Sequence, residues 1–148
     1  MSDEALSLAL EALARKERTV AELGSWLRGR GVEYGQVEEV VDQLVSTGVL
    51  DDARYARRYA EDKRELRGWG SERIRTALFE RGIADEDVEE ALGGGGVEGE
   101  IELALGLLRD RALRLDDPRE RQRALGLLAR RGYDSEVAYE AIRRASSD

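Results

Sequence analysis

The segment RGWGSERIR at residues 67–75 brings together side chains that could do recognition chemistry. Three arginines stand within nine positions, and a tryptophan lies between two glycines. The planar guanidinium group donates paired hydrogen bonds to carboxylates and phosphates, and arginine and tryptophan are both enriched at the hot spots of protein interfaces. The segment therefore indicates a binding surface for an anionic partner, in a chain whose own net charge is −8.

The rest of the composition excludes most catalytic chemistry. The chain has neither histidine nor cysteine, which excludes histidine acid–base catalysis, thiolate nucleophiles and the usual zinc ligand sets. We interpret its many carboxylates as solvated helix faces. The glycine run at 93–96 lacks the Lys and Ser/Thr of a phosphate-binding P-loop. We therefore predict a protein that is not an enzyme and that has no cofactor and no metal site.

Basic residues are concentrated in two islands. Residues 53–81 carry nine basic and five acidic side chains, residues 109–131 carry eight and four, and residues 82–108 carry eight acidic and no basic ones. One interpretation is a set of solvated helix faces held by ion pairs four residues apart. The alternative is a binding surface with stripes of charge. The candidate binding residues are Arg54, Arg57, Arg58, Arg67, Trp69, Arg73 and Arg75 in the first island, and Arg109, Arg111, Arg119, Arg123, Arg130 and Arg131 in the second.

Two interpretations of Trp69 stay open at this point. The side chain folds back to fill the seam between two helices, or it is an exposed anchor for a partner. The flanking Gly68 and Gly70 allow a tight turn, and we expect one of them to have a positive φ. Arg73 and Arg75 follow this turn and lie off the apolar stripe of their segment. We therefore expect them to share one patch with the arginines of the preceding helix.

The elements that carry these residues are predicted to be helices. Ala, Leu, Glu and Arg are abundant, and there is a single proline. The strings LRGRGV, LFERGI and LARRGY each end in a glycine and one apolar residue, and a leucine stands four positions before that glycine. The three glycines are Gly31, Gly82 and Gly132, so they are 51 and 50 residues apart. Apolar residues coincide at fixed offsets around them. The pattern indicates one structural unit that is used three times.

The apolar spacing within each unit is helical, as in Val37, Val40 and Leu44. The glycine near the end of each repeated string suits a left-handed C-cap of the preceding helix. We predict three helices per unit. The nine helices are expected near residues 4–16, 19–30, 34–47, 52–66, 71–81, 85–92, 98–114, 118–131 and 135–145.

Polar residues mark the starts of several of these helices. Thr19 and Glu22 match a capping box, and Asp117 is an N-cap candidate before Pro118 at the first helical position. Short polar side chains at such positions accept hydrogen bonds from backbone N–H groups that have no partner within the helix. The other expected N-caps are Asp51, Asp52, Asp85 and Asp134.

The repeat divides the chain into units at 1–49, 50–93 and 94–148. A three-helix unit of about 50 residues buries little surface alone, so neighbouring units are expected to pack in a row. The predicted fold class is all-α: three tandem three-helix repeats, similar to helix-turn-helix units, in an elongated body whose curvature the sequence leaves open. The tetraglycine at 93–96 is expected to be a flexible link.

The sequence also bears on where the protein acts. The N-terminal segment MSDEALSLAL is acidic where a signal peptide is basic, and no apolar run approaches ~18 residues. The absence of cysteine fits a reducing compartment. We expect a cytoplasmic monomer that does not bind a membrane.

Residues 48–83 resemble the signature region of the RecX family of bacterial recombination regulators. That region opens with G-[YF]-[LI]-[DN]-D-x-[RK]-[FY]-A, continues with [RK]-G-[YFW]-G-x-x-[RK]-[ILV] and closes with L-x-x-[RK]-G-[IV]. Residues 12–23 and 130–142 are similar to the first and third units of the family, so the resemblance covers all three units. The residues that match the signature are Gly48, Leu50, Asp51, Asp52, Arg54, Tyr55, Ala56, Arg67, Gly68, Trp69, Gly70, Arg73, Ile74, Leu78, Arg81, Gly82 and Ile83.

This resemblance implies a regulatory protein that binds the RecA recombinase. Proteins of this family lodge in the groove of the RecA filament on single-stranded DNA, and they limit its growth. They suppress its ATPase, strand-exchange and co-protease activities, bind DNA weakly and are not enzymes. The resemblance therefore places the chain in DNA recombination, DNA repair and the SOS response, with the RecA filament as its partner.

Two other functions stay open on the residues alone. A three-helix unit can serve as a helix-turn-helix reader of DNA. The segment 34–47 argues against this, because Glu38, Glu39 and Asp42 would repel phosphates. A helical-repeat adaptor for some other protein is compatible with everything except the specificity of the match at 48–83.

Overall fold

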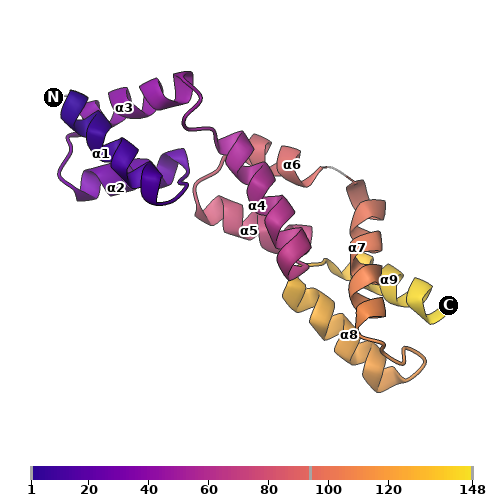
Figure 1. Ribbon diagram of the computed structural model, residues 1–148. Helices are drawn as coiled ribbons and strands as arrows, with labels where there is room; N and C mark the ends of the chain where they lie inside the picture. Colours follow the sequence, from indigo (N-terminus) through magenta and orange to yellow (C-terminus); the bar gives the residue numbers. More distant parts are fainter. Residues whose placement is uncertain (1, 94, 148) are drawn as a thin grey trace.

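The computed structural model describes residues 2–93 and 95–147, and in these ranges it contains nine α-helices and no strand. This confirms the predicted all-α class, and the helices lie at the nine predicted positions (Figure 1). In chain order they are α1 (Ser2–Arg15), α2 (Val20–Gly29), α3 (Tyr34–Ser46), α4 (Asp52–Arg67), α5 (Ser71–Glu80), α6 (Asp85–Leu92), α7 (Gly96–Asp110), α8 (Pro118–Arg131) and α9 (Ser135–Ser147).

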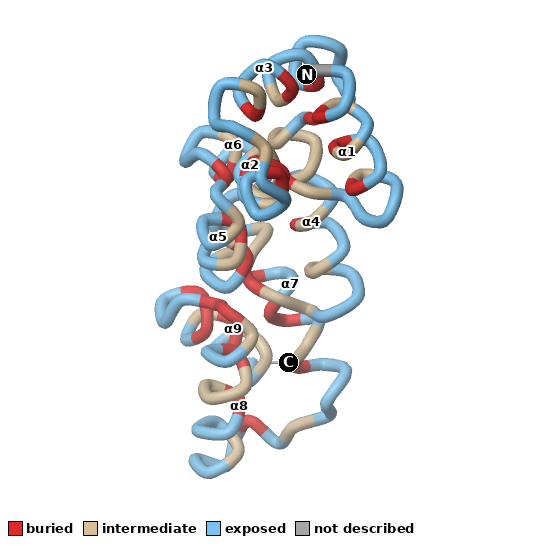
Figure 2. The backbone as a smooth tube through the Cα atoms, turned by 90° about the vertical axis from the view of Figure 1, so that its left-hand side faces the viewer, coloured by how far each residue is buried: buried red, intermediate tan, exposed pale blue. Residues whose placement is uncertain are grey.

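Each successive group of three helices encloses its own cluster of buried apolar side chains. We call α1–α3, α4–α6 and α7–α9 units one, two and three. The repeated leucines Leu27, Leu78 and Leu128 are fully buried, one in each cluster. Burying a leucine side chain stabilises a fold by roughly 1.5–3 kcal/mol. Figure 2 shows the buried residues on the inner sides of the helices, with exposed outer faces. The exact residue limits of the units stay a prediction.

The three units follow one another along the molecule (Figure 1). Unit one lies at one end, unit three lies at the other, and unit two lies between them. The helix pairs with extensive contacts all belong to the same unit, so adjacent units meet through few and specific contacts. Among the residues that the structure describes, no helix is long and apolar enough to cross a membrane.

Most of the predicted helix caps are confirmed. The Thr19 hydroxyl accepts a hydrogen bond from the Glu22 N–H, and the Glu22 carboxylate accepts one from the Thr19 N–H. Asp51, Asp117 and Asp134 accept backbone N–H groups at the starts of α4, α8 and α9. The repeat glycines have the expected positive φ, which is +84° at Gly31, +83° at Gly82 and +96° at Gly132.

Two of the cap predictions are wrong. Ala84 is the N-cap of α6, and Asp85 is already the first helical residue. Asp52 is likewise the first residue of α4, and its carboxylate accepts a hydrogen bond of 2.9 Å from the Val20 N–H of unit one. Burial raises the pKa of Asp52 above its ordinary value. Asp52 therefore connects units one and two, a role that the local sequence does not indicate.

Helix α7 ends earlier than predicted, at Asp110 rather than near residue 114. Ala112 takes a left-handed conformation with φ +50°, which stops the helix. At its start, α7 includes Gly96, so the predicted tetraglycine link is partly helical. Gly93 forms the C-cap of α6, and Gly94 lies outside the described residues. The flexibility of the link stays a prediction.

The second helices of neighbouring units meet end to end, and Figure 1 shows α2, α5 and α8 following one another. At the start of α5, the N–H groups of Gly70 and Glu72 donate to the carbonyls of Arg131 (2.6 Å) and Gly132 (3.0 Å) at the end of α8. The first N–H groups and the last carbonyl groups of a helix have no partner in that helix, so the N–H groups that start α5 pair with the carbonyls that end α8. The helix dipoles are also aligned head to tail.

Candidate functional site

The turn between α4 and α5 holds the centre of the RGWGSERIR segment. Gly68 is the C-cap of α4 with φ +65°, whereas Gly70 has an extended conformation with φ −86°. This confirms that one of the two glycines has a positive φ. A Cβ on Gly70 would lie 2.6 Å from the carbonyl oxygen of Gly132, so glycine is needed there for the close approach of unit three.

Trp69 is half-buried and packs against the core of unit two. Its ring meets Tyr59 edge-on at 6.3 Å between ring centroids. The guanidinium carbon of Arg73 lies 4.1 Å from the Trp69 ring centroid, and the Lys63 ammonium lies 4.8 Å from it. Such contacts contribute about 0.5–1 kcal/mol each at partly exposed sites. Trp69 thus fills a helix seam, as one interpretation expects, while its role as a partner anchor stays a prediction.

Two arginines connect unit two to unit three through carbonyl groups. Arg73 on α5 donates to the carbonyl of Arg130, at 2.9 Å, and Arg131 on α8 donates to the carbonyl of Arg67, at 2.8 Å. Both acceptors stand in the last turn of a helix, where carbonyls lack intrahelical partners and attract cations. The two arginine bonds run in opposite directions across the junction and hold the turn at 67–70 against the end of α8.

A groove opens at this junction. It has a volume of about 590 Å³ and is lined on the side of unit two by Arg67, Trp69 and Arg73, and on the side of unit three by Leu103 and Leu107. The guanidinium group of Arg67 is exposed and makes no hydrogen bond or ion pair within the described ranges. An anionic group could therefore reach Arg67 without displacing an internal partner.

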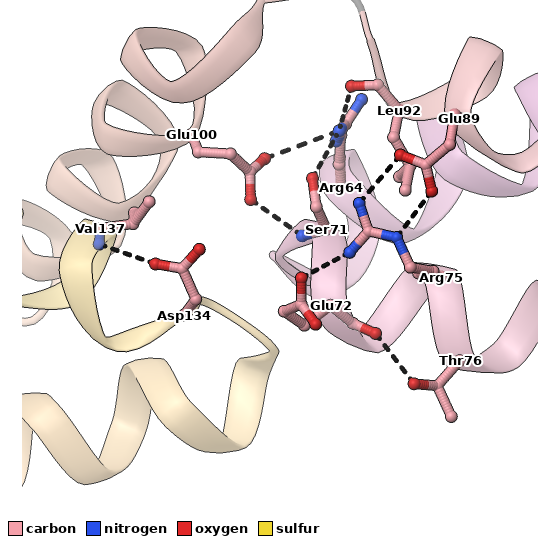
Figure 3. Close-up of polar contacts among 10 residues, drawn as sticks. All are labelled: Arg64, Ser71, Glu72, Arg75, Thr76, Glu89, Leu92, Glu100, Asp134 and Val137. Carbon is pink, nitrogen blue, oxygen red and sulfur yellow. Dashed lines mark hydrogen bonds and ion pairs between the residues drawn. The ribbon is translucent and has the colours of Figure 1, made fainter.

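Arg75 does not lie on this surface, so the expectation of a single patch containing Arg73 and Arg75 is wrong. Residues two positions apart project about 160° apart around a helix of 3.6 residues per turn. Arg75 donates two hydrogen bonds to Glu89 of α6, at 2.8 and 3.1 Å, and a further bond to Glu72 (Figure 3). Hydrogen bonding to Glu89 raises the pKa of Arg75 above its ordinary value. This guanidinium is occupied within unit two.

The arginines of α4 are also engaged inside the molecule. Arg54 donates to the carbonyls of the loop before α4, at 3.2 Å each. Arg57 pairs with Glu90 at 3.1 Å, and Arg58 pairs with Glu17 of unit one at 3.4 Å. The last two pairs are exposed at the surface, where an ion pair contributes little and can be exchanged for another partner. The first basic island is therefore divided over several faces.

The second basic island forms a more open surface. Arg119, Arg123 and Arg130 are exposed on α8, and their positions in the helix fall within about 40° of one another around its axis. In the described part of the chain these three guanidinium groups have no hydrogen bond or ion pair. Arg109 and Arg111 lie apart from them, in the last turn and at the C-cap of α7.

No sequence pattern indicates the polar contacts that hold units two and three together. The Glu100 carboxylate of α7 accepts a 2.9 Å hydrogen bond from the Ser71 N–H, which starts α5, and lies 3.6 Å from the Arg64 guanidinium. Arg64 also donates to the Ser71 hydroxyl and the Leu92 carbonyl (Figure 3). The contact of Lys63 with the Trp69 ring is likewise unmarked in the sequence. The partners in these contacts are 6 to 36 residues apart, and no local pattern marks them.

Replacing Tyr133 by phenylalanine is expected to lower the free energy of unfolding by about 1 kcal/mol at neutral pH, because the hydroxyl donates a hydrogen bond to the Gly68 carbonyl. Burial, with the charge of Glu100 nearby, raises the pKa of Tyr133 from 10.0 to about 12. The neutral hydroxyl therefore stabilises the folded state below pH 10, and this contribution is lost as the pH rises towards 12. Urea unfolding of both proteins should show their difference shrinking over that interval. A difference independent of pH would contradict this assignment.

These features define a class of protein: an all-helical chain of three tandem three-helix units, with arginines displayed at a junction and along one helix. In the described part of the molecule no group of acidic side chains is placed to hold a metal ion. The family model for the second three-helix domain of RecX matches residues 51–92, and the model for the first three-helix domain of RecX matches residues 5–44. The chain belongs to the RecX family, which confirms the resemblance seen in its sequence.

Relatives support this membership over nearly the whole chain. Regulatory protein RecX of Mycolicibacterium vanbaalenii is 32% identical over 149 residues, which cover 95% of this chain and 81% of that protein. Regulatory protein RecX of Mycobacterium ulcerans is 33% identical over 144 residues, which cover 95% and 83%. Membership gives this chain a regulatory role of the RecX kind.

Two crystal structures share the fold. That of RecX from Lactobacillus salivarius has a TM-score of 0.89 at 21% identity and covers 99% of this chain and 97% of its own. A second, of regulatory protein RecX, has a TM-score of 0.79 at 26% identity and covers 97% and 71%. The three-unit architecture is therefore shared over the full length of this chain.

Proposed function

We propose that this protein binds the RecA filament on single-stranded DNA and limits its growth, its ATPase, its strand exchange and its co-protease activity. The proposal follows from family membership together with the open arginine surface. In this proposal the protein acts as a monomer in the bacterial cytoplasm, during recombination, repair and the SOS response. It works by binding and has no catalytic step.

One observation carries the proposal: Arg67, Arg119, Arg123 and Arg130 point outwards with no internal partner in the described residues. An arginine that is not used within the fold keeps its full donor capacity for a phosphate or carboxylate. In a chain of net charge −8, such a surface selects where an anionic partner can approach. A RecA filament offers both acidic protein surface and DNA phosphates.

The charge distribution favours a nucleoprotein over bare duplex DNA. Exposed Glu38, Glu39 and Asp42 occupy the outer side of α3, the helix that a helix-turn-helix reader would place near DNA. Acidic side chains there would repel phosphates, and salt would weaken the remaining contacts further. Direct binding to single-stranded DNA is therefore proposed to be weak, with RecA supplying most of the contact.

A time course of ATP hydrolysis by RecA on single-stranded DNA tests the proposal. Adding this protein should slow hydrolysis progressively as its concentration rises, because each bound molecule shortens the active filament. Hydrolysis that stays unchanged at saturating protein would reject the function. A gel-shift experiment without RecA separates the alternative. Tight binding to one duplex sequence at about 150 mM salt would favour a DNA-binding regulator instead.

A further inference from the structure

Unit two carries a groove that unit three covers. Its floor is formed by α5 and α6, with the ion pair between Arg75 and Glu89 and the buried Leu92 (Figure 3). Val97 and Glu100 from the first two turns of α7 line the other side of the groove, together with the start of α9. Val97 remains 69% exposed. The remaining cavity has a volume of about 240 Å³. This is the surface on which the following unit docks.

Unit three carries the same groove, between α8 and α9, in an open state. The equivalence rests on the repeat, because adding 50 to a residue number of unit two gives the matching position of unit three. Nothing in the described ranges covers this groove, and its volume is about 620 Å³. Residues 71, 72, 75, 89, 92, 93 and 96 line the groove of unit two, and their equivalents Arg121, Gln122, Leu125, Tyr139, Ile142, Arg143 and Ser146 line that of unit three.

The chemistry of the open groove differs from that of the covered one. Leu125 and Tyr139 stand where unit two has the pair Arg75 and Glu89, so the floor is apolar instead of ionic. Tyr139 is 62% exposed, which leaves a large aromatic surface in water. Arg121 contributes positive charge at one edge of the groove, where it also donates to the Leu115 carbonyl at 3.3 Å. Arg143 lines the groove too, but its charge is paired with Glu140 of α9. An apolar floor with a guanidinium group, that of Arg121, at its edge fits a ligand that is aliphatic and acidic.

The start of α7, which packs against the groove of unit two, indicates that such a ligand would be a helix. Val97 and Glu100 stand three positions apart at the start of a helix, so they project from the same side. Val97 lines the groove at its solvent side, while the Glu100 carboxylate meets the Ser71 N–H and the Arg64 guanidinium at its edge. In unit three Arg121 replaces Ser71, so a carboxylate at the same place would meet a guanidinium group.

The first unit of a second copy fits this description only in part. Met1 and Glu4 stand at an offset of 96 from Val97 and Glu100, but the rest of α1 differs from α7. Buried Ala5, Ala9 and Ala12 of α1 correspond, at an offset of 96, to buried Ile101, Leu105 and Leu108 of α7. At the same offset, Ser7 and Glu11 of α1 are exposed where α7 has Leu103 and Leu107. The outer side of α1 is therefore polar, as in the capping repeat at the end of an array. A helix of another protein is the better occupant.

We propose that the groove between α8 and α9 binds an amphipathic helix of another protein, one that carries an aliphatic residue in its first turn and a carboxylate three positions later. The helix takes the place on unit three that α7 takes on unit two. This proposal goes beyond the proposed function, since it concerns a different surface from that of Arg119, Arg123 and Arg130 and does not require RecA.

The test uses the complete protein and a fluorescent peptide with the sequence of residues 96–110, which covers the equivalent groove. Fluorescence anisotropy should show saturable binding. Tyr139→Glu is expected to weaken binding by about tenfold or more, because it removes a central aromatic contact and repels the peptide carboxylate. Tyr34→Glu is the matched control, since Tyr34 is 65% exposed but lies on α3, and it should bind like the wild type.

Three results would overturn the proposal. Binding that is equal in the wild type and in Tyr139→Glu would place the peptide elsewhere. Absence of saturable binding would show that the groove does not accept a helix of this chemistry. Self-association in sedimentation that Tyr139→Glu abolishes would assign the groove to a second copy of the chain. Weaker binding of a peptide with Glu100→Gln would in turn support the predicted role of the carboxylate.

Discussion

Replacing Gly132 by alanine is expected to lower the free energy of unfolding by about 3 kcal/mol, because two separate penalties add at this residue. Its φ of +96° is unfavourable for a residue with a side chain. A Cβ would also lie 2.2 Å from the Cβ of Arg73 and 2.6 Å from its backbone nitrogen. The start of α5 would have to move away, which would break the bonds between the ends of α8 and α5. Urea unfolding followed by circular dichroism measures the loss.

The repeat supplies matched variants for this prediction. Gly82 has φ +83°, and a Cβ there would lie 2.4 Å from the Cβ of Ala21 in unit one, so Gly82→Ala should be similarly costly. Gly31 has φ +84°, yet a Cβ there would meet nothing within 4 Å. Gly31→Ala should therefore cost only the backbone penalty, about 1 kcal/mol. Equal losses at all three glycines would show that the junctions contribute nothing beyond the backbone conformation.

The helices of this protein could be predicted because their determinants are local. Apolar residues at helical spacing and a glycine at each repeated C-terminus are enough to place an element, and both are visible in any stretch of about 15 residues. The turn at Gly68 was predictable for the same reason. The early end of α7 was not, because Ala112 takes a left-handed conformation that is unusual for alanine.

The binding surface was less predictable because it depends on which arginines are consumed inside the fold. Arg57, Arg58 and Arg75 look alike in the sequence, but each pairs with a carboxylate 14 to 41 residues away. Only the packing of the helices decides whether those carboxylates are within reach. Arg119 and Arg123 lie four positions apart on α8, and no acidic side chain is placed to pair with either of them in the described residues.

Arg119 and Arg123, unlike the paired arginines of unit two, can be changed without breaking an ion pair within the described residues. Reversing the charge of both Arg119 and Arg123 by substitution with glutamate is expected to raise the concentration needed for half-inhibition of the RecA ATPase by about tenfold or more. Two favourable contacts with an anionic partner become repulsive, whereas no internal bond is lost. The stability of the protein should stay within about 0.5 kcal/mol of the wild type, since both side chains are exposed.

A control with the same change in charge separates the local effect from the net charge. Lys16→Glu with Arg28→Glu alters two exposed basic residues of unit one, away from the α8 surface. This variant should inhibit nearly as well as the wild type if contact with Arg119 and Arg123 is what matters. If both double variants weaken inhibition equally, the effect arises from long-range repulsion, and the arginine surface of α8 has no special role. Repeating the assay at higher salt helps to decide between the two, because screening over about 8 Å at physiological ionic strength removes long-range repulsion more completely than it removes direct contacts.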